Sequence, residues 1–182
     1  MKQNFPTTRI LPLGQTITNR LFNILSIVVL LTLHSVTAVK AQFLTAASYP
    51  FTASAKTFTY LTGGTSVALQ SDDITVQNIP IGFTFTYCGI NYTTVSACSN
   101  GFMALGNKAG TTFTNSLANT AAIRPMLMPL WDDMQGVGST TSYRTTGSVG
   151  SRVFTFEWRN TRPLASTTNP EISIQVKLYE GA

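Results

Sequence analysis

Apolar and polar residues alternate in the last third of the chain, and this pattern predicts β-strands. In residues 152–160, RVFTFEWRN, every second side chain is aromatic, and in residues 171–180, EISIQVKLYE, every second one is aliphatic. Successive side chains of a strand point to opposite faces, so both segments are expected to be half-buried and to pair as antiparallel neighbours. The predicted core residues are Phe154, Phe156, Trp158, Ile174 and Val176.

The middle of the chain alternates in the same way around an Asn-Gly turn. Residues 81–89, IGFTFTYCG, lead through a tight connection into residues 92–100, and Asn100-Gly101 then turns or bulges the backbone. Asn-Gly beside alternating residues is a strong signal for a β-turn. We therefore predict that the stretch from Val95 to Gly106 is the pivot around which the neighbouring segments pack.

The remaining segments are less regular. Residues 42–58 are expected to form an irregular lead-in, which begins to alternate before Gly63-Gly64. Residues 65–69 are the predicted hairpin partner of that first strand, and residues 107–120 are expected to form a long loop. One helical turn is predicted near residues 117–123.

Short strands separated by frequent turn signals are typical of a β-sandwich. Residues 126–131, MLMPLW, fit an edge strand or a bulge, because proline cannot donate a ladder hydrogen bond. The predicted fold class is all-β: an antiparallel β-sandwich, jelly-roll or immunoglobulin-like, that follows a signal peptide.

A basic leader with Arg9 and Arg20 precedes an apolar run over residues 21–36. As a helix this run measures roughly 24 Å, less than the roughly 30 Å membrane core. Small residues precede Gln42 at the positions that a signal peptidase requires. We predict a signal peptide over residues 1–41, with an uncleaved anchor as the alternative, and one extracellular module over residues 42–182 with no membrane span. Because its strongest strand lies at the end, the module is expected to be truncated at its C-terminus.

The net charge of +5 comes mostly from the leader. Four of the twelve basic residues precede Gln42, so eight basic and seven acidic residues follow it. These eight cations are scattered along the sequence, whereas a nucleic-acid-binding face needs clustered ones. No nucleic-acid partner is expected.

The only histidine, His34, lies in the leader. The mature chain therefore lacks Ser-His-Asp and Cys-His nucleophiles in their common forms, and histidine zinc sites. A pair of carboxylates could still serve a glycosidase. Glu157, however, alternates outward beside Arg159 and opposite the strand of Lys177, so it is expected to form a surface ion pair. We predict no catalytic residue and no enzymatic activity.

Trp131, Asp132 and Asp133 form the most suggestive polar cluster. They are weak candidates for ligand binding: the carboxylates for calcium or a sugar, and the tryptophan as a stacking surface. The alternative is a turn in which the aspartates cap backbone amides while Trp131 packs in the core. We expect the capped turn, and a turn also at Asp72-Asp73. No cofactor is predicted apart from a possible calcium ion.

Cys88 and Cys98 are the only cysteines. Two cysteines in an exported protein usually form a disulfide. If Gly89-Ile90 is a hairpin turn, however, Cys98 lies roughly 20 Å along the strand, beyond the reach of such a bond. The sequence leaves both states open.

The order IPIGFTFTYCGINYTTVSACSNGFMALG, RPMLMPLWDDM, YRTTG, RVFTFEWRN and EISIQVKLYE resembles N-terminal modules of secreted Bacteroidetes surface proteins, which carry fibronectin-type repeats and type IX sorting domains. It is also distantly similar to the nidogen-type extracellular domain. The resemblance implies a secreted or cell-surface module with an adhesive, ligand-binding or structural role and an unknown glycan or protein partner. The alternative is a fragment of a carbohydrate-active enzyme or its carbohydrate-binding domain.

Overall fold

The structure is a computed structural model that describes residues 45–136, 140–166 and 171–181. The predicted signal peptide, its cleavage site and His34 lie outside the described residues. The elements are η1 (Ala46–Ser48), β1 (Thr65–Ser66), β2 (Thr75–Tyr87), β3 (Ile90–Cys98), β4 (Met103–Leu105), η2 (Leu117–Ile123), β5 (Met126–Leu127), β6 (Met134–Gln135), β7 (Thr140–Thr146), β8 (Val153–Pro163) and β9 (Ile172–Tyr179).

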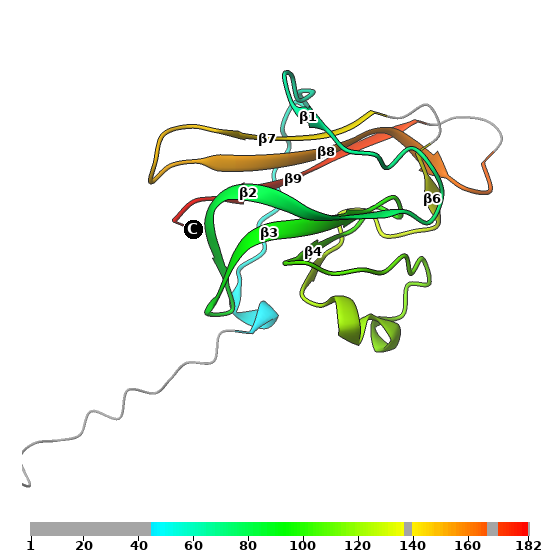
Figure 1. Cartoon of the computed structure of the whole chain (residues 1–182), viewed down its shortest axis with the longest axis horizontal. Coiled ribbons are helices and arrows are strands. Elements are labelled where there is room, and N and C mark those ends of the chain that lie inside the picture. The colour runs from blue at the N-terminus through cyan, green and yellow to red at the C-terminus, as the bar shows by residue number, and fades with distance from the viewer. Residues whose placement is uncertain (1–44, 137–139, 167–170, 182) are drawn as a thin grey trace, which may run out of the picture. The chain divides into compact units, whose positions relative to one another are not determined.

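Two antiparallel sheets face each other (Figure 1). One is a four-stranded sheet in the order β2-β3-β4-β5, and the other is a five-stranded sheet in the order β1-β7-β8-β6, with β9 also paired to β8. Among the described residues, β9 has no strand on its other edge. The predicted all-β sandwich is confirmed, and the predicted helical turn appears as the 3₁₀ helix η2.

Aromatic residues of β8 fill the space between the sheets. Phe154, Phe156 and Trp158 are at most 1% exposed, as predicted, and the indole N–H of Trp158 donates to the Cys98 carbonyl across the sandwich (2.9 Å). In β9 the predicted core residues Ile174 and Val176 pack against this core but are only partly buried. The apolar face of β9 is therefore less completely covered than that of β8.

Asn100 and Gly101 form the predicted pivot. The buried Asn100 amide donates to the Asp73 carboxylate and to the Thr111 carbonyl, both at 2.8 Å, and accepts from the Met134 amide at 3.0 Å. Gly101 has φ +70°, and a Cβ there would lie 1.9 Å from the Leu130 carbonyl oxygen, so only glycine fits. One side chain thus connects the segments of Asp73 and Thr111 to the start of β6.

Three sequence-based boundaries are wrong. Residues 65–69 do not form a hairpin with the segment before Gly63, because β1 pairs with β7. The predicted strand over residues 126–131 is limited to β5, Met126–Leu127, which lies between Pro125 and Pro129. The strand expected over residues 81–89 is longer at its start, because β2 begins at Thr75 and runs through Pro80 with register shifts on either side.

An ion pair joins the start of β8 to the end of β9 in the five-stranded sheet. The Glu180 carboxylate pairs with the Arg152 guanidinium (2.5 Å), which also donates to the Gly82 carbonyl of β2. The hydrogen bond from Arg152 is the main cause that lowers the pKa of Glu180 from 4.5 to about 2, against the opposing effect of desolvation. This contact links both sheets through one guanidinium.

Glu180 should make stability depend on pH. A carboxyl group with a lowered folded-state pKa stabilises fully above its unfolded pKa, and this stabilisation is lost as the pH falls through the folded value. We therefore expect the melting temperature of Glu180→Gln to lie furthest below that of the unaltered protein above pH 4.5, with the gap closing towards pH 2. Thermal melts across this range measure it; a gap that stayed constant would contradict the assignment.

Candidate functional site

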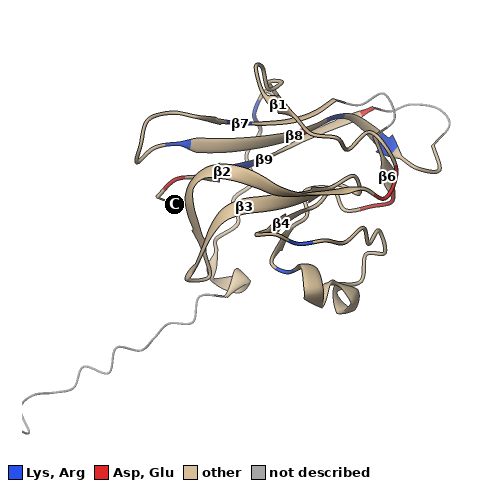
Figure 2. Ribbon diagram, in the orientation of Figure 1, with Lys and Arg blue, Asp and Glu red and all other residues tan. Residues whose placement is uncertain are grey.

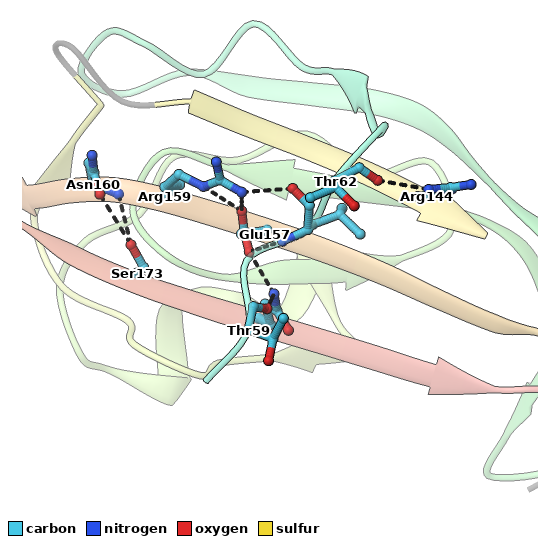
Figure 3. Close-up of polar contacts among 9 residues, drawn as sticks. Thr59, Thr62, Arg144, Glu157, Arg159, Asn160 and Ser173 are labelled. Carbon is cyan, nitrogen blue, oxygen red and sulfur yellow. Dashed lines mark hydrogen bonds and ion pairs between the residues drawn. The ribbon is translucent and has the colours of Figure 1, made fainter. Parts of the chain in front are cut away.

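The segment before Gly63-Gly64 crosses the outer face of the five-stranded sheet. We call residues 56–62 the strap. The Glu157 carboxylate of β8 accepts hydrogen bonds from the Leu61 amide (2.8 Å) and from Gln175 of β9 (2.6 Å). Gln175 in turn donates to the Thr59 carbonyl (2.8 Å). Figure 3 shows Glu157 pointing from β8 towards this segment. The strap is held by side chains of the sheet, without strand pairing.

Glu157 is a buried anchor, which corrects the predicted exposed surface pair. The Glu157 side chain is only 1% exposed. The residue opposite Glu157 in the β8–β9 ladder is Gln175, not Lys177. The predicted ion pair with Arg159 is present at 2.6 Å. Arg159 also donates to the Leu61 carbonyl (2.7 Å) and lies over the Tyr60 ring (4.4 Å to its centroid). The negative charge of the Glu157 carboxylate is therefore balanced by Arg159 beneath the strap.

Two shallow hollows adjoin along the strap, because they share Thr59, Gln175 and Lys177. One has a volume of about 530 Å³ and the other of about 240 Å³. We call the two hollows together the strap groove. Its lining residues are Lys56, Thr57, Phe58, Thr59, Tyr60, Leu61, Thr62, Pro129, Arg144, Thr146, Thr155, Ser173, Ile174, Gln175 and Lys177. Hydroxyl groups predominate among its polar side chains, and among the residues that the structure describes no Asp or Glu lines it.

An aromatic pair lies exposed in the groove. The rings of Phe58 and Tyr60 meet edge to face, with centroids 5.3 Å apart. Their side chains are 45% and 50% exposed. Aromatic rings usually bury most of their surface in a core or an interface. Two half-exposed rings on a strap of polar residues therefore mark a surface suited to contact with another molecule.

The groove is also cationic. Lys56, Arg144 and Lys177 line it and are exposed. Among the described residues, the ion pairs involve Arg152 and Arg159 instead, so none of these three cations has a carboxylate partner. They lie far apart in the sequence, and the fold gathers cations that the sequence pattern described as scattered.

The predicted Trp131-Asp132-Asp133 cluster is part of a structural corner. The Trp131 indole N–H donates to the Thr112 carbonyl (2.8 Å), and the ring packs edge to face on Phe102. The Asp132 carboxylate accepts the Asp133 amide (2.8 Å), so the predicted backbone cap is present there. These contacts favour the structural interpretation of the Trp131 and Asp132 side chains.

The fold brings the two predicted acidic turns together. Acidic residues gather beside β6 (Figure 2). Partial desolvation is the main cause that raises the pKa of Asp133, and the negative charges of Asp72, Asp73 and Asp132 raise it further. Within residues 45–136, 140–166 and 171–181, however, no group of three or more His, Cys, Asp or Glu side chains is arranged to hold a metal ion. The corner concentrates negative charge without forming a cation site in this structure.

The capped turn and the calcium site predict different outcomes for Asp132→Ala. If the carboxylate only caps the Asp133 amide, its loss should cost about 1 kcal/mol of unfolding free energy, since another acceptor is needed there. Asp132→Asn, which retains an acceptor oxygen, should lose less. We expect the denaturation midpoints of the unaltered protein and of both variants to be insensitive to added calcium. A calcium-dependent rise that only the unaltered protein shows would support the metal site.

The cysteines lie near opposite ends of strand β3, and both are free. Cys88 belongs to the tight connection between β2 and β3, and Cys98 is the last residue of β3. The structure therefore decides the open question against a Cys88–Cys98 disulfide. Burial raises the pKa of the Cys98 thiol, which makes this sulfur a weak nucleophile.

The sequence pattern missed the strap groove, although one signal for it was present. The alternation of residues 57–61, TFTYL, predicts a strand before Gly63-Gly64. Because Glu157 and Arg159 bind the backbone of this segment, it crosses the sheet with Phe58 and Tyr60 half-exposed. The gathering of Lys56, Arg144 and Lys177 follows from tertiary structure and has no local sequence signal.

Comparison with known proteins identifies a family. The family model described as NIDO related matches residues 48–182, which include all the described strands. No match was found among curated proteins or among solved structures. The family match supports the distant nidogen-type similarity, whereas Bacteroidetes surface proteins, fibronectin-type repeats and type IX sorting domains remain predictions. No helix within the described part of the chain is long and apolar enough to span a membrane.

Proposed function

Because the chain belongs to the NIDO-related family, we propose that it is a non-catalytic module of a secreted or cell-surface protein and that it binds an extracellular glycan or protein. The family match supports an extracellular type of module. Adhesion and a place in a larger surface protein extend that assignment and belong to the proposal.

The strap groove is the observation that carries the binding role. It combines half-exposed aromatic rings, hydroxyl groups and cations without carboxylate partners among the described residues. Arg144 and Lys177 lie on strands, and the strap that carries the rings is fixed to the sheet by Glu157, Arg159 and Gln175. Binding sites that rest on rigid elements need little reorganisation when a ligand arrives. Such a surface has the features of a recognition site.

The lining of the groove also favours binding over hydrolysis. A glycosidase needs two carboxyl groups on opposite sides of the scissile bond, about 5 to 9.5 Å apart. Within residues 45–136, 140–166 and 171–181, no carboxyl group lines the strap groove. Glu157 lies buried beneath the strap, and its oxygens are engaged by Leu61, Gln175 and Arg159. The groove therefore lacks the acid and the base of that reaction.

A binding and turnover panel tests this function. Purified protein is presented with neutral polysaccharides, acidic polysaccharides and extracellular proteins, and each mixture is assayed for saturable binding and for new reducing ends. We expect binding to at least one class with no release of reducing ends. Turnover that co-purifies with the protein and disappears in a carboxylate variant would overturn the proposal in favour of the enzyme.

A further inference from the structure

We propose that the strap groove binds an acidic oligosaccharide, one that carries carboxylate or sulfate groups, along the strap and β9. This inference rests on the proposed function and names its ligand class. It follows from three features of the groove: the sign of its charge, its exposed rings and its polar floor.

The charge of the groove selects an anion. Lys56, Arg144 and Lys177 line the groove. The negative charge of Glu157, which lies beneath the strap, is balanced by its ion pair with Arg159. Cations on an open surface without acidic neighbours raise the local concentration of anions and steer their approach. Arg144 already donates to the Thr62 carbonyl of the strap (2.8 Å), so a neutral ligand would chiefly leave the charges of Lys56 and Lys177 without a partner of opposite sign.

The exposed rings favour a sugar over a peptide. Phe58 and Tyr60 present half-exposed aromatic surface, and one face of the Tyr60 ring is already covered by the Arg159 guanidinium. The C–H face of a pyranose is flat and apolar, so it can pack on such rings while its hydroxyls remain at the edge. A strongly acidic peptide offers no such flat face.

The polar floor of the groove suits hydroxyl-rich ligands. Thr57 and Thr59 contribute hydroxyls that can both donate and accept. The Ser173 hydroxyl is already bonded to Asn160, and the Gln175 amide nitrogen to Thr59 and Glu157, so these two side chains fix the shape of the groove. The hollows are open and adjoining, which fits several sugar units laid side by side better than one enclosed small molecule. Charge, rings and hydroxyls together specify an anionic oligosaccharide.

Binding to defined polymers tests the inference. The probes are polygalacturonate, dextran sulfate, neutral dextran and poly-L-glutamate, measured by titration calorimetry at low and at moderate salt. The unaltered protein should bind the two anionic polysaccharides, more weakly at higher salt, and should not bind neutral dextran. Binding of polygalacturonate but not dextran sulfate would show that the groove recognises carboxylate groups. Binding of dextran sulfate but not polygalacturonate would show that it recognises sulfate groups.

Three variants locate the site. Phe58→Ala and Lys177→Ser should each weaken binding about tenfold, because each removes one contact of roughly 1.4 kcal/mol. Lys108→Ser removes the same charge from the loop after β4, outside the groove, and should change affinity less than about twofold. Thermal melts check that all three remain folded.

The failures of this inference and of the proposed function are distinguishable. If Lys177→Ser and Lys108→Ser weakened polysaccharide binding equally, or if Phe58→Ala left it unchanged, the ligand would not bind in the strap groove. Poly-L-glutamate binding as tightly as the polysaccharides would overturn the sugar in favour of an acidic peptide. Saturable binding of only a neutral glycan or a protein would overturn this inference and leave the proposed function intact, and binding of none of these ligands would overturn both.

Discussion

Phe156→Ala is expected to lower the free energy of unfolding by about 3–5 kcal/mol. The side chain is 0% exposed and lies between the two sheets, where its ring meets the Trp158 ring edge to face at 4.4 Å. Truncation to alanine removes its dispersion contacts and leaves a cavity that two paired sheets cannot close. The ladder neighbours Tyr143 and Val176 stay fixed by their own strands.

Urea denaturation of Phe156→Ala beside the unaltered protein measures the effect. Val149→Ala serves as the control, because Val149 lies in the β7–β8 turn and is 85% exposed, so its truncation should change stability little. A midpoint for Phe156→Ala as close to the unaltered value as that of the control would show that Phe156 does not belong to the core.

The outcome for β8 shows which features of this fold a sequence reveals. Alternation identified Phe154, Phe156 and Trp158 as inward-facing, because side-chain period and burial are both local properties of a strand. The Asn100-Gly101 pivot was also accessible, since the turn needs a residue that tolerates positive φ. Such features depend on a few consecutive residues.

Pairing and solvent exposure of the strap depended on distant residues. The TFTYL segment alternates as a strand does, yet its backbone binds Glu157, Arg159 and Gln175 rather than a neighbouring strand. The sequence pattern placed Glu157 outward, which is its correct side of the sheet. It could not show that residues almost a hundred positions earlier would cover it. The candidate site was missed for the same reason.

Glu157→Gln should release the strap. The substitution preserves the size of the side chain but removes its charge and turns one acceptor into a donor. That donor would face the amide of Leu61, the amide of Gln175 or the guanidinium of Arg159, all of which donate. Removing one partner of a buried, hydrogen-bonded ion pair typically costs 3–5 kcal/mol. Arg159 is 28% exposed and can regain water, so we expect about 2–3 kcal/mol here.

Two measurements separate release of the strap from a general loss of stability. Amide exchange at Leu61 should quicken more in Glu157→Gln than exchange at Phe156 in the middle of β8, because only the former loses its acceptor directly. Glu171→Gln makes the same chemical change at an exposed residue just before β9, and should leave both exchange and the urea midpoint unaltered. A Leu61 amide that stayed as protected in Glu157→Gln as in Glu171→Gln would contradict the anchor. Since the strap carries Phe58 and Tyr60, its release should also weaken binding in the strap groove, which connects one buried carboxylate to recognition at the surface.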